Sequence, residues 1–198
     1  MRTQASSRKD DSYDYRHPSH RRHRPGIHRG RQGAALCHFR SGLPHRCPGC
    51  HNPQTHDFSG GTVVPFSRLL SEIRKNPLLK GVTFSGGEPF CQAEAFARLA
   101  RQIRTLPGKL DLTVYSGYTF EELLEKAKTE PGTAALLKEA DFLIDGPYHS
   151  EERDLSLLFR GSRNQRYLDL KLSLARSIPV PAPEHSLSAR FRYSHRTA

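Results

Sequence analysis

Residues 81–89 read Gly-Val-Thr-Phe-Ser-Gly-Gly-Glu-Pro, a short β-rich run that ends in two glycines and a carboxylate. β-branched and aromatic residues favour a strand, and the Gly-Gly pair marks the turn that follows it. On both sides the apolar residues recur every three to four positions, which predicts helices. This stretch therefore predicts a strand, a tight turn and a helix within an α/β fold.

The same alternation extends in both directions from this stretch. Helices are expected over 66–75, 93–106, 120–128 and 133–139, and strands over 81–85, 110–115 and 141–145. Thr119 and Glu122 form a capping box at the start of one helix. Strands that alternate with helices predict a parallel sheet, with chemistry in the loops after the strand carboxyl ends. Residues 167–174 are expected to form a last strand or a short helix.

The two ends of the chain differ in composition from its middle. Residues 1–46 hold eleven Lys and Arg against three Asp, a net charge of +8, and residues 184–198 add a net +2. The first segment has almost no large aliphatic side chains, so it cannot bury enough apolar area to offset its ordering entropy. We expect disordered tails at 1–40 and 181–198 around one domain at 41–180. Since the charge lies in the tails, a nucleic-acid partner is not expected.

Cysteine usage and hydropathy indicate the compartment. The cysteines at positions 37, 47, 50 and 91 are too few for a disulfide scaffold in a chain of 198 residues. No apolar run reaches the length of a membrane span, and no signal peptide opens the chain. We therefore expect a cytoplasmic protein with no membrane partner.

Cys47 and Cys50 form a Cys-x-x-Cys pair inside a loop rich in glycine, proline and histidine. Thiolates at this spacing suit zinc or an iron–sulfur cluster. A thioredoxin-like redox pair is disfavoured, because that motif opens a helix after a strand. Zinc would take two further ligands from the neighbouring histidines, His45, His51 and His56. The cysteine pair alone leaves zinc and iron–sulfur open.

The turn at Gly86, Gly87 and Glu88 also allows two interpretations. Two glycines let a ligand approach the backbone closely, and a carboxylate can accept a hydrogen bond from an ammonium group. The same residues also make an ordinary tight turn between a strand and a helix. Ser116, at the end of the next strand, is either a further ligand contact or a turn serine.

Taken together, the cysteine loop and the Gly-Gly-Glu-Pro turn resemble the radical S-adenosylmethionine superfamily. Further stretches narrow the resemblance to the activating proteins of anaerobic ribonucleoside-triphosphate reductases, over roughly residues 41–180. These stretches, in order along the chain, are Cys-Pro-Gly-Cys-His-Asn-Pro-Gln-Thr from Cys47, Phe58-Ser-Gly-Gly61, Val114-Tyr-Ser-Gly-Tyr-Thr-Phe-Glu-Glu-Leu123, Leu143-Ile-Asp-Gly-Pro-Tyr148 and Arg160-Gly-Ser-Arg-Asn-Gln-Arg166.

The resemblance implies a small partial (β/α) barrel of parallel strands, with cluster and cofactor at the strand carboxyl ends. It implies a [4Fe–4S] cluster on Cys47 and Cys50, and S-adenosylmethionine held by Gly86, Gly87, Glu88 and Ser116. No catalytic residue is implied beyond these cofactor ligands.

The implied reaction is reductive cleavage of S-adenosylmethionine, whose 5′-deoxyadenosyl radical takes a hydrogen from a glycine of the reductase. The implied partners are the large subunit of that reductase and an electron donor such as a flavodoxin or ferredoxin. The alternative function is a non-catalytic zinc-binding module with a basic arm that contacts nucleic acid.

The chain departs from the family pattern at the start of the cysteine loop. Leu43 stands where a first cluster cysteine would complete Cys-x3-Cys-x2-Cys, and leucine offers iron no lone pair. Cys37 or Cys91 could serve as the third ligand, but Cys37 lies too early for the usual loop. We also expect the first strand to be missing, and hypothesise that residues 1–43 are read out of frame. A gene with no alternate frame encoding a strand and a cysteine would refute this hypothesis.

Overall fold

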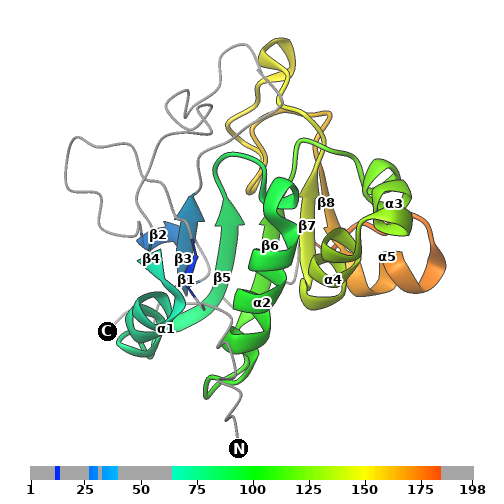
Figure 1. The fold of residues 1–198 in the computed structure, drawn as a ribbon. Coiled ribbons are helices and arrows are strands. Elements are labelled where there is room, and N and C mark those ends of the chain that lie inside the picture. Colours follow the sequence, from blue (N-terminus) through cyan, green and yellow to red (C-terminus); the bar gives the residue numbers. More distant parts are fainter. Residues whose placement is uncertain (1–11, 14–26, 31–32, 40–63, 184–198) are drawn as a thin grey trace, which may run out of the picture.

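The computed structural model describes residues 12–13, 27–30, 33–39 and 64–183, with side-chain surroundings for 64–183. Within these residues the chain alternates between strand and helix, as the apolar periodicity predicts. Helices cover one face of a central sheet (Figure 1). The parallel strands point the same way, so the loops that follow them gather at one end.

The central sheet has six strands in the order β2-β3-β5-β6-β7-β8. Neighbours from β3 to β7 pair in parallel, whereas β2 and β8 pair antiparallel at the two edges. β1 and β4 form a separate antiparallel pair. The strands are β1 (Ser12–Tyr13), β2 (Ile27–Gly30), β3 (Gly33–Phe39), β4 (Val64–Pro65), β5 (Leu79–Ser85), β6 (Asp111–Tyr115), β7 (Phe142–Asp145) and β8 (Arg166–Asp169).

Five α-helices lie among the described residues, and a short 3₁₀ helix, η2 (Pro89–Gln92), precedes the second of them. None of them has the length and apolar character needed to cross a membrane. The helices are α1 (Phe66–Arg74), α2 (Ala93–Arg104), α3 (Phe120–Thr129), α4 (Pro131–Glu139) and α5 (Leu170–Arg176), and another 3₁₀ turn, η3, covers Ser150–Glu152.

Side-chain alternation in β6 separates the two faces of the sheet. Leu112 and Val114 are fully buried against the helices, whereas Thr113 and Tyr115 on the opposite face are partly exposed. The helical face holds the main core, to which Phe84, Phe96, Phe120, Leu123, Leu136 and Leu143 contribute fully buried side chains. The opposite face carries a smaller cluster of Ile144, Tyr167 and Ala182, with Tyr115, Phe142 and Leu158 packed against it. The opposite face is therefore less completely covered.

The predicted elements of the domain are confirmed from α1 to β7, with ends that shift by at most two residues. The capping box is also present: Thr119 Oγ1 accepts from the Glu122 amide at 3.3 Å, and Glu122 Oε2 accepts from the Thr119 amide at 2.7 Å. Residues 167–174 were expected to form one element. They are divided between β8 and α5, because Asp169 ends the strand and accepts a hydrogen bond from the Leu172 amide as the helix cap.

The expectation of a missing first strand is corrected by β3. This strand pairs in parallel with β5 from Ala34 to Phe39, and the residues paired across it include Cys37 and Thr83. The run Gly-Ala-Ala-Leu-Cys-His-Phe has only two large apolar side chains and lies within Arg- and His-rich sequence, so no strand was predicted there. The first parallel strand therefore belongs to the segment 1–40 that we expected to be disordered.

A close contact between α2 and α4 gives a stability prediction. A Cβ at Gly132 would lie 2.9 Å from the Glu94 amide nitrogen and 3.2 Å from its Cα. Alanine favours helix by about 1 kcal/mol over glycine, but here the backbones would have to separate. We expect Gly132→Ala to lower the free energy of unfolding by about 1–3 kcal/mol, measured by urea denaturation. Lys138→Ala, at an exposed position of the same helix, is the control, and an equally stable Gly132→Ala would contradict the prediction.

Candidate functional site

Three parallel strand ends meet at the candidate site. β5 ends at Ser85, β6 at Tyr115 and β7 at Asp145. The Ser116 amide donates to the Ile144 carbonyl at 2.9 Å, which extends the β6–β7 pairing by one residue. β5 pairs in parallel with β6 on its other side, so the loops after β5 and β6 also leave the sheet side by side.

Glu88 connects these two loops from a buried position. Its side chain is 1% exposed, and Oε2 accepts from the Gly117 amide at 2.8 Å. Oε1 accepts from the Phe90 amide at 3.0 Å and from the Ser116 hydroxyl at 3.1 Å. The Ser116 hydroxyl oxygen in turn accepts from the Tyr118 amide at 3.0 Å. One carboxylate thus caps η2 and holds the loop after β6.

Burial also changes the acidity of this carboxyl. Desolvation raises the pKa of Glu88 to about 7, although the hydrogen bonds from Phe90, Gly117 and Ser116 lower it. Taking a carboxylate out of water disfavours its charged form, and here that cost exceeds the stabilisation from its donors. Glu88 can therefore change its charge near neutral pH.

The glycines before Glu88 make the turn sterically possible. Gly86 has a φ of 82° and Gly87 a φ of 22°, in the region that side-chain-bearing residues rarely adopt. Both glycines are partly exposed, whereas Glu88 and Pro89 after them are buried. The turn therefore leaves backbone accessible directly beside a buried carboxylate. The predicted residues Gly86, Gly87, Glu88 and Ser116 lie together.

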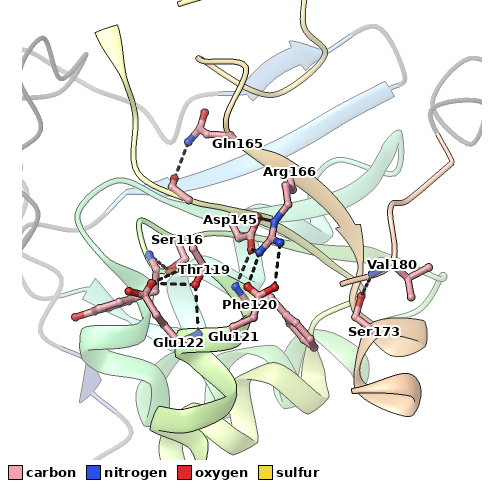
Figure 2. Close-up of polar contacts among 12 residues, drawn as sticks. Ser116, Thr119, Phe120, Glu121, Glu122, Asp145, Gln165, Arg166, Ser173 and Val180 are labelled. Carbon is pink, nitrogen blue, oxygen red and sulfur yellow. Dashed lines mark hydrogen bonds and ion pairs between the residues drawn. The ribbon is translucent and has the colours of Figure 1, made fainter. Parts of the chain in front are cut away.

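A second buried carboxylate, Asp145, lies at the end of β7 (Figure 2). It is fully buried, and its Oδ2 accepts from the Phe120 amide at 2.7 Å, at the start of α3. Arg166 donates from Nε to Oδ1 at 3.0 Å and from Nη2 to Oδ2, and it also pairs with Glu121 at 2.7 Å. These carboxylates raise the pKa of the Arg166 guanidinium further above its ordinary value. The pair fixes α3 against β7 and β8.

The motif at residues 160–166 holds the long loop between β7 and β8. Gln165 donates to the Gly146 carbonyl at 3.0 Å and accepts from the Gly161 amide at 2.8 Å. Asn164 donates to the Pro147 carbonyl at 2.7 Å. These contacts close the loop onto the end of β7, and Figure 2 shows Gln165 above Arg166. The motif was recognisable in the sequence only as part of the family resemblance, and it predicted no role for these residues.

Comparison with known proteins adds to this geometry. Residues 30–168 match the family described as "4Fe-4S single cluster domain". An anaerobic ribonucleoside-triphosphate reductase-activating protein of Haemophilus influenzae is 32% identical over 141 residues, covering 68% of this chain and 86% of the relative. The chain belongs to the family of these reductase-activating proteins. A protein of the same name from Escherichia coli K12 is 33% identical over 139 residues, covering 64% and 82%, and one from phage T4 is 30% identical over 141 residues, covering 68% and 83%.

The family match changes the interpretation of the amino-terminal segment. It begins at residue 30 and so includes β3 and the residues up to Leu43. Residues up to 40 were expected to lie outside the domain, and residues up to 43 to be read out of frame. A strand that pairs within the sheet and falls inside the match argues against that hypothesis for residues 33–39.

The predicted metal ligands Cys47 and Cys50 lie outside the described residues, as do Leu43 and the histidines at positions 45, 51 and 56. Cys91, the candidate third ligand, is exposed on η2, three residues after Glu88. Within the described residues no group of three His, Cys, Asp or Glu side chains could hold a metal ion. The assignment of cluster ligands therefore stays a prediction.

The acidity of Glu88 gives a prediction for stability against pH. Below its ordinary pKa of 4.5 the group is protonated in both the folded and unfolded chain. Between there and about pH 7 only the unfolded chain ionises, so stability falls as pH rises, by up to about 3 kcal/mol. We expect Glu88→Gln to flatten this slope in urea unfolding from about pH 5 to 8. Glu94→Gln, an exposed change on α2, is the control, and an unaltered slope in Glu88→Gln would refute the prediction.

Removing Arg166 tests the second buried carboxylate. We expect Arg166→Met to cost about 2–3 kcal/mol of unfolding free energy, because Asp145 would lose its guanidinium partner while staying buried. Glu121→Gln removes the exposed arm of the same network and should cost less than about 1 kcal/mol. Chemical denaturation of both variants measures the difference. Equal losses would show that Asp145 is not the partner that matters.

Proposed function

We propose that this chain is a radical S-adenosylmethionine activating protein for an anaerobic ribonucleoside-triphosphate reductase. The observation that carries the proposal is the buried Glu88 beside the partly exposed Gly86–Gly87 turn, at the carboxyl ends of parallel strands. The names of the relatives supply the target reductase. When bound, the cluster supplies one electron that cleaves S-adenosylmethionine and so leads to a glycyl radical on the reductase.

The chain's own residues shape the binding site for the methionine part of S-adenosylmethionine. Gly86 and Gly87 are partly exposed, and without side chains they let a ligand approach the backbone closely. Glu88 and Ser116 fix the relative position of the loops after β5 and β6 through their hydrogen bond of 3.1 Å. An ammonium group next to Glu88 would lower the pKa of its carboxyl and favour the charged form. Ligand binding near neutral pH is therefore coupled to loss of a proton from Glu88.

The donor set for the cluster falls one thiolate short in the cysteine loop. Cys47 and Cys50 supply two sulfur ligands, and Leu43 supplies none. Soft thiolates are the ligands that iron–sulfur clusters require, and an aliphatic side chain cannot replace one. We therefore propose that this chain assembles its cluster poorly.

The proposal also covers the partners of the chain, the shape of its sheet and the extent of its domain. The activated partner would be the reductase large subunit, and the electron would come from a cytoplasmic donor such as a flavodoxin or ferredoxin. The sheet would curve into a partial (β/α) barrel, with cluster and cofactor at the strand carboxyl ends, where Glu88 and Ser116 lie. The domain was expected to end at residue 180, but it includes residues 181–183, because Ala182 is buried and its amide donates to the Tyr167 carbonyl at 2.9 Å.

Restoring the missing ligand tests this proposal. We expect the natural chain to bind well below about four irons after anaerobic reconstitution, and Leu43→Cys to approach that number. Because β3 supplies the strand that precedes the loop, this single change should be sufficient. Iron and sulfide analysis with electron paramagnetic resonance of the reduced protein measures the outcome.

Leu43→Ser is the matched control, since serine changes the polarity of the position but supplies no thiolate. A full, reducible [4Fe–4S] cluster in the natural chain would disprove the impairment. One bound zinc in place of iron and sulfide would instead support the zinc-binding module.

A further inference from the structure

The long loop between β7 and β8 holds two large apolar side chains in solvent. Leu155 is 77% exposed and Phe159 is 39% exposed. The loop is the yellow segment at the top of Figure 1, beyond the end of β7. We name residues 155–160 the apolar loop. Large apolar side chains exposed together are typical of a contact surface.

Backbone contacts hold the base of this loop in one shape. The Asp154 amide donates to the Gly161 carbonyl at 3.2 Å, and the Arg163 amide donates to the Glu152 carbonyl at 2.9 Å. An antiparallel bridge pairs Arg153 with Ser162 between them. A loop that is ordered before it meets a partner loses little conformational entropy on binding.

Phe159 has a backbone conformation that is unfavourable for a bulky residue. Its φ is 63°, in the left-handed region. The Tyr115 hydroxyl donates to the Phe159 carbonyl at 2.6 Å, and the Phe159 ring lies 6.2 Å from the ring of Tyr167. Such strain persists only where the surrounding structure enforces it, and it concentrates at functional sites. Tyr115 and Tyr167 thus hold the Phe159 side chain partly in water.

The apolar loop is joined directly to the candidate site. Tyr115, which holds Phe159, is the last residue of β6, and Ser116, which donates to Glu88, follows it. The loop after β7 and the loops after β5 and β6 all leave the same end of the parallel strands. A molecule that covers the apolar loop would therefore extend toward Glu88.

The charges around the apolar loop indicate the class of partner. Exposed side chains beside it carry charges of both signs: Glu151 is negative, and Arg153 and Arg163 are positive. Nucleic acids and anionic membrane surfaces select for clustered positive charge. An apolar centre with a rim of mixed charge is typical of protein–protein interfaces.

We propose that the apolar loop is the docking surface for the reductase polypeptide, with Leu155 and Phe159 as its anchors. This inference rests on the proposed function, because that function requires a folded protein to bring one of its residues to the strand carboxyl ends. A folded protein that brings one of its residues to the strand carboxyl ends also contacts the loops that project beside them. Among the described residues at this end of the strands, the apolar loop offers the partner exposed apolar side chains to bury.

The experiment measures the affinity of the full-length chain for the purified anaerobic reductase of the same organism by calorimetric titration. We expect Leu155→Asp and Phe159→Gly each to weaken binding by about tenfold or more. Glycine is chosen at position 159 because it tolerates the positive φ. Leu78→Asp is the matched control, since Leu78 is 72% exposed but precedes β5, at the opposite end of the strands. It should change the affinity by less than about twofold.

Other outcomes overturn the inference. Loop variants that bind as tightly as the natural chain would refute the docking surface and leave the proposed function intact. A natural chain with no affinity for the reductase would refute both. A fall in thermal midpoint in the loop variants, or a change in their self-association by sedimentation, would show that the apolar loop contacts this chain or a second copy instead.

Discussion

A single buried carboxylate connects the parts of the candidate site that the sheet alone does not position. Strand pairing brings the ends of β5, β6 and β7 together, but the loops beyond them have no ladder of their own. Glu88, in the loop after β5, accepts hydrogen bonds from Ser116 and Gly117 in the loop after β6 and from the start of η2. Its burial is unfavourable for the charged form, so a carboxylate is retained at an energetic cost. This cost is consistent with a residue kept for a ligand rather than for stability.

Asp145 repeats the arrangement one strand further along. It also lies at a strand end, is fully buried, and accepts from the first amide of a helix. The difference is that Asp145 forms a hydrogen-bonded ion pair with Arg166, whereas at Glu88 desolvation is the largest effect and raises the pKa of its carboxyl to about 7. The two carboxylates therefore have different tasks: Asp145 joins secondary-structure elements, and Glu88 keeps a titratable group at the site.

The sequence predicted the fold best where local chemistry and packing agree. The helix that Thr119 and Glu122 cap, and the buried runs around Phe84 and Val114, needed no tertiary information. β3 was missed because strand pairing, not its own weakly apolar sequence, stabilises it. The Asp145–Arg166 pair was missed for a related reason. Its partners lie 21 residues apart and meet only when β8 turns back along β7.

For the candidate site, the sequence predicted which residues lie together but not how their side chains contact one another. Gly86, Gly87, Glu88 and Ser116 follow adjacent strands, and parallel topology brings such residues together. The hydrogen bonds that make Glu88 a link between loops depend on side-chain direction, which no motif specifies. Nor could the sequence show that Phe159 is held in a left-handed conformation, because that depends on the distant hydroxyl of Tyr115.

The core of the described domain has a consequence for a chain that lacks one cluster ligand. Among the described residues, the buried apolar side chains include no cysteine, and the sheet closes its core with leucine, phenylalanine and alanine. The core of the described residues can therefore pack without bound iron. If Leu43 impairs cluster assembly and the apolar loop binds the reductase, as proposed above, such a chain would still bind the reductase without activating it. In a cell that also holds an intact copy, it would then compete for the same partner.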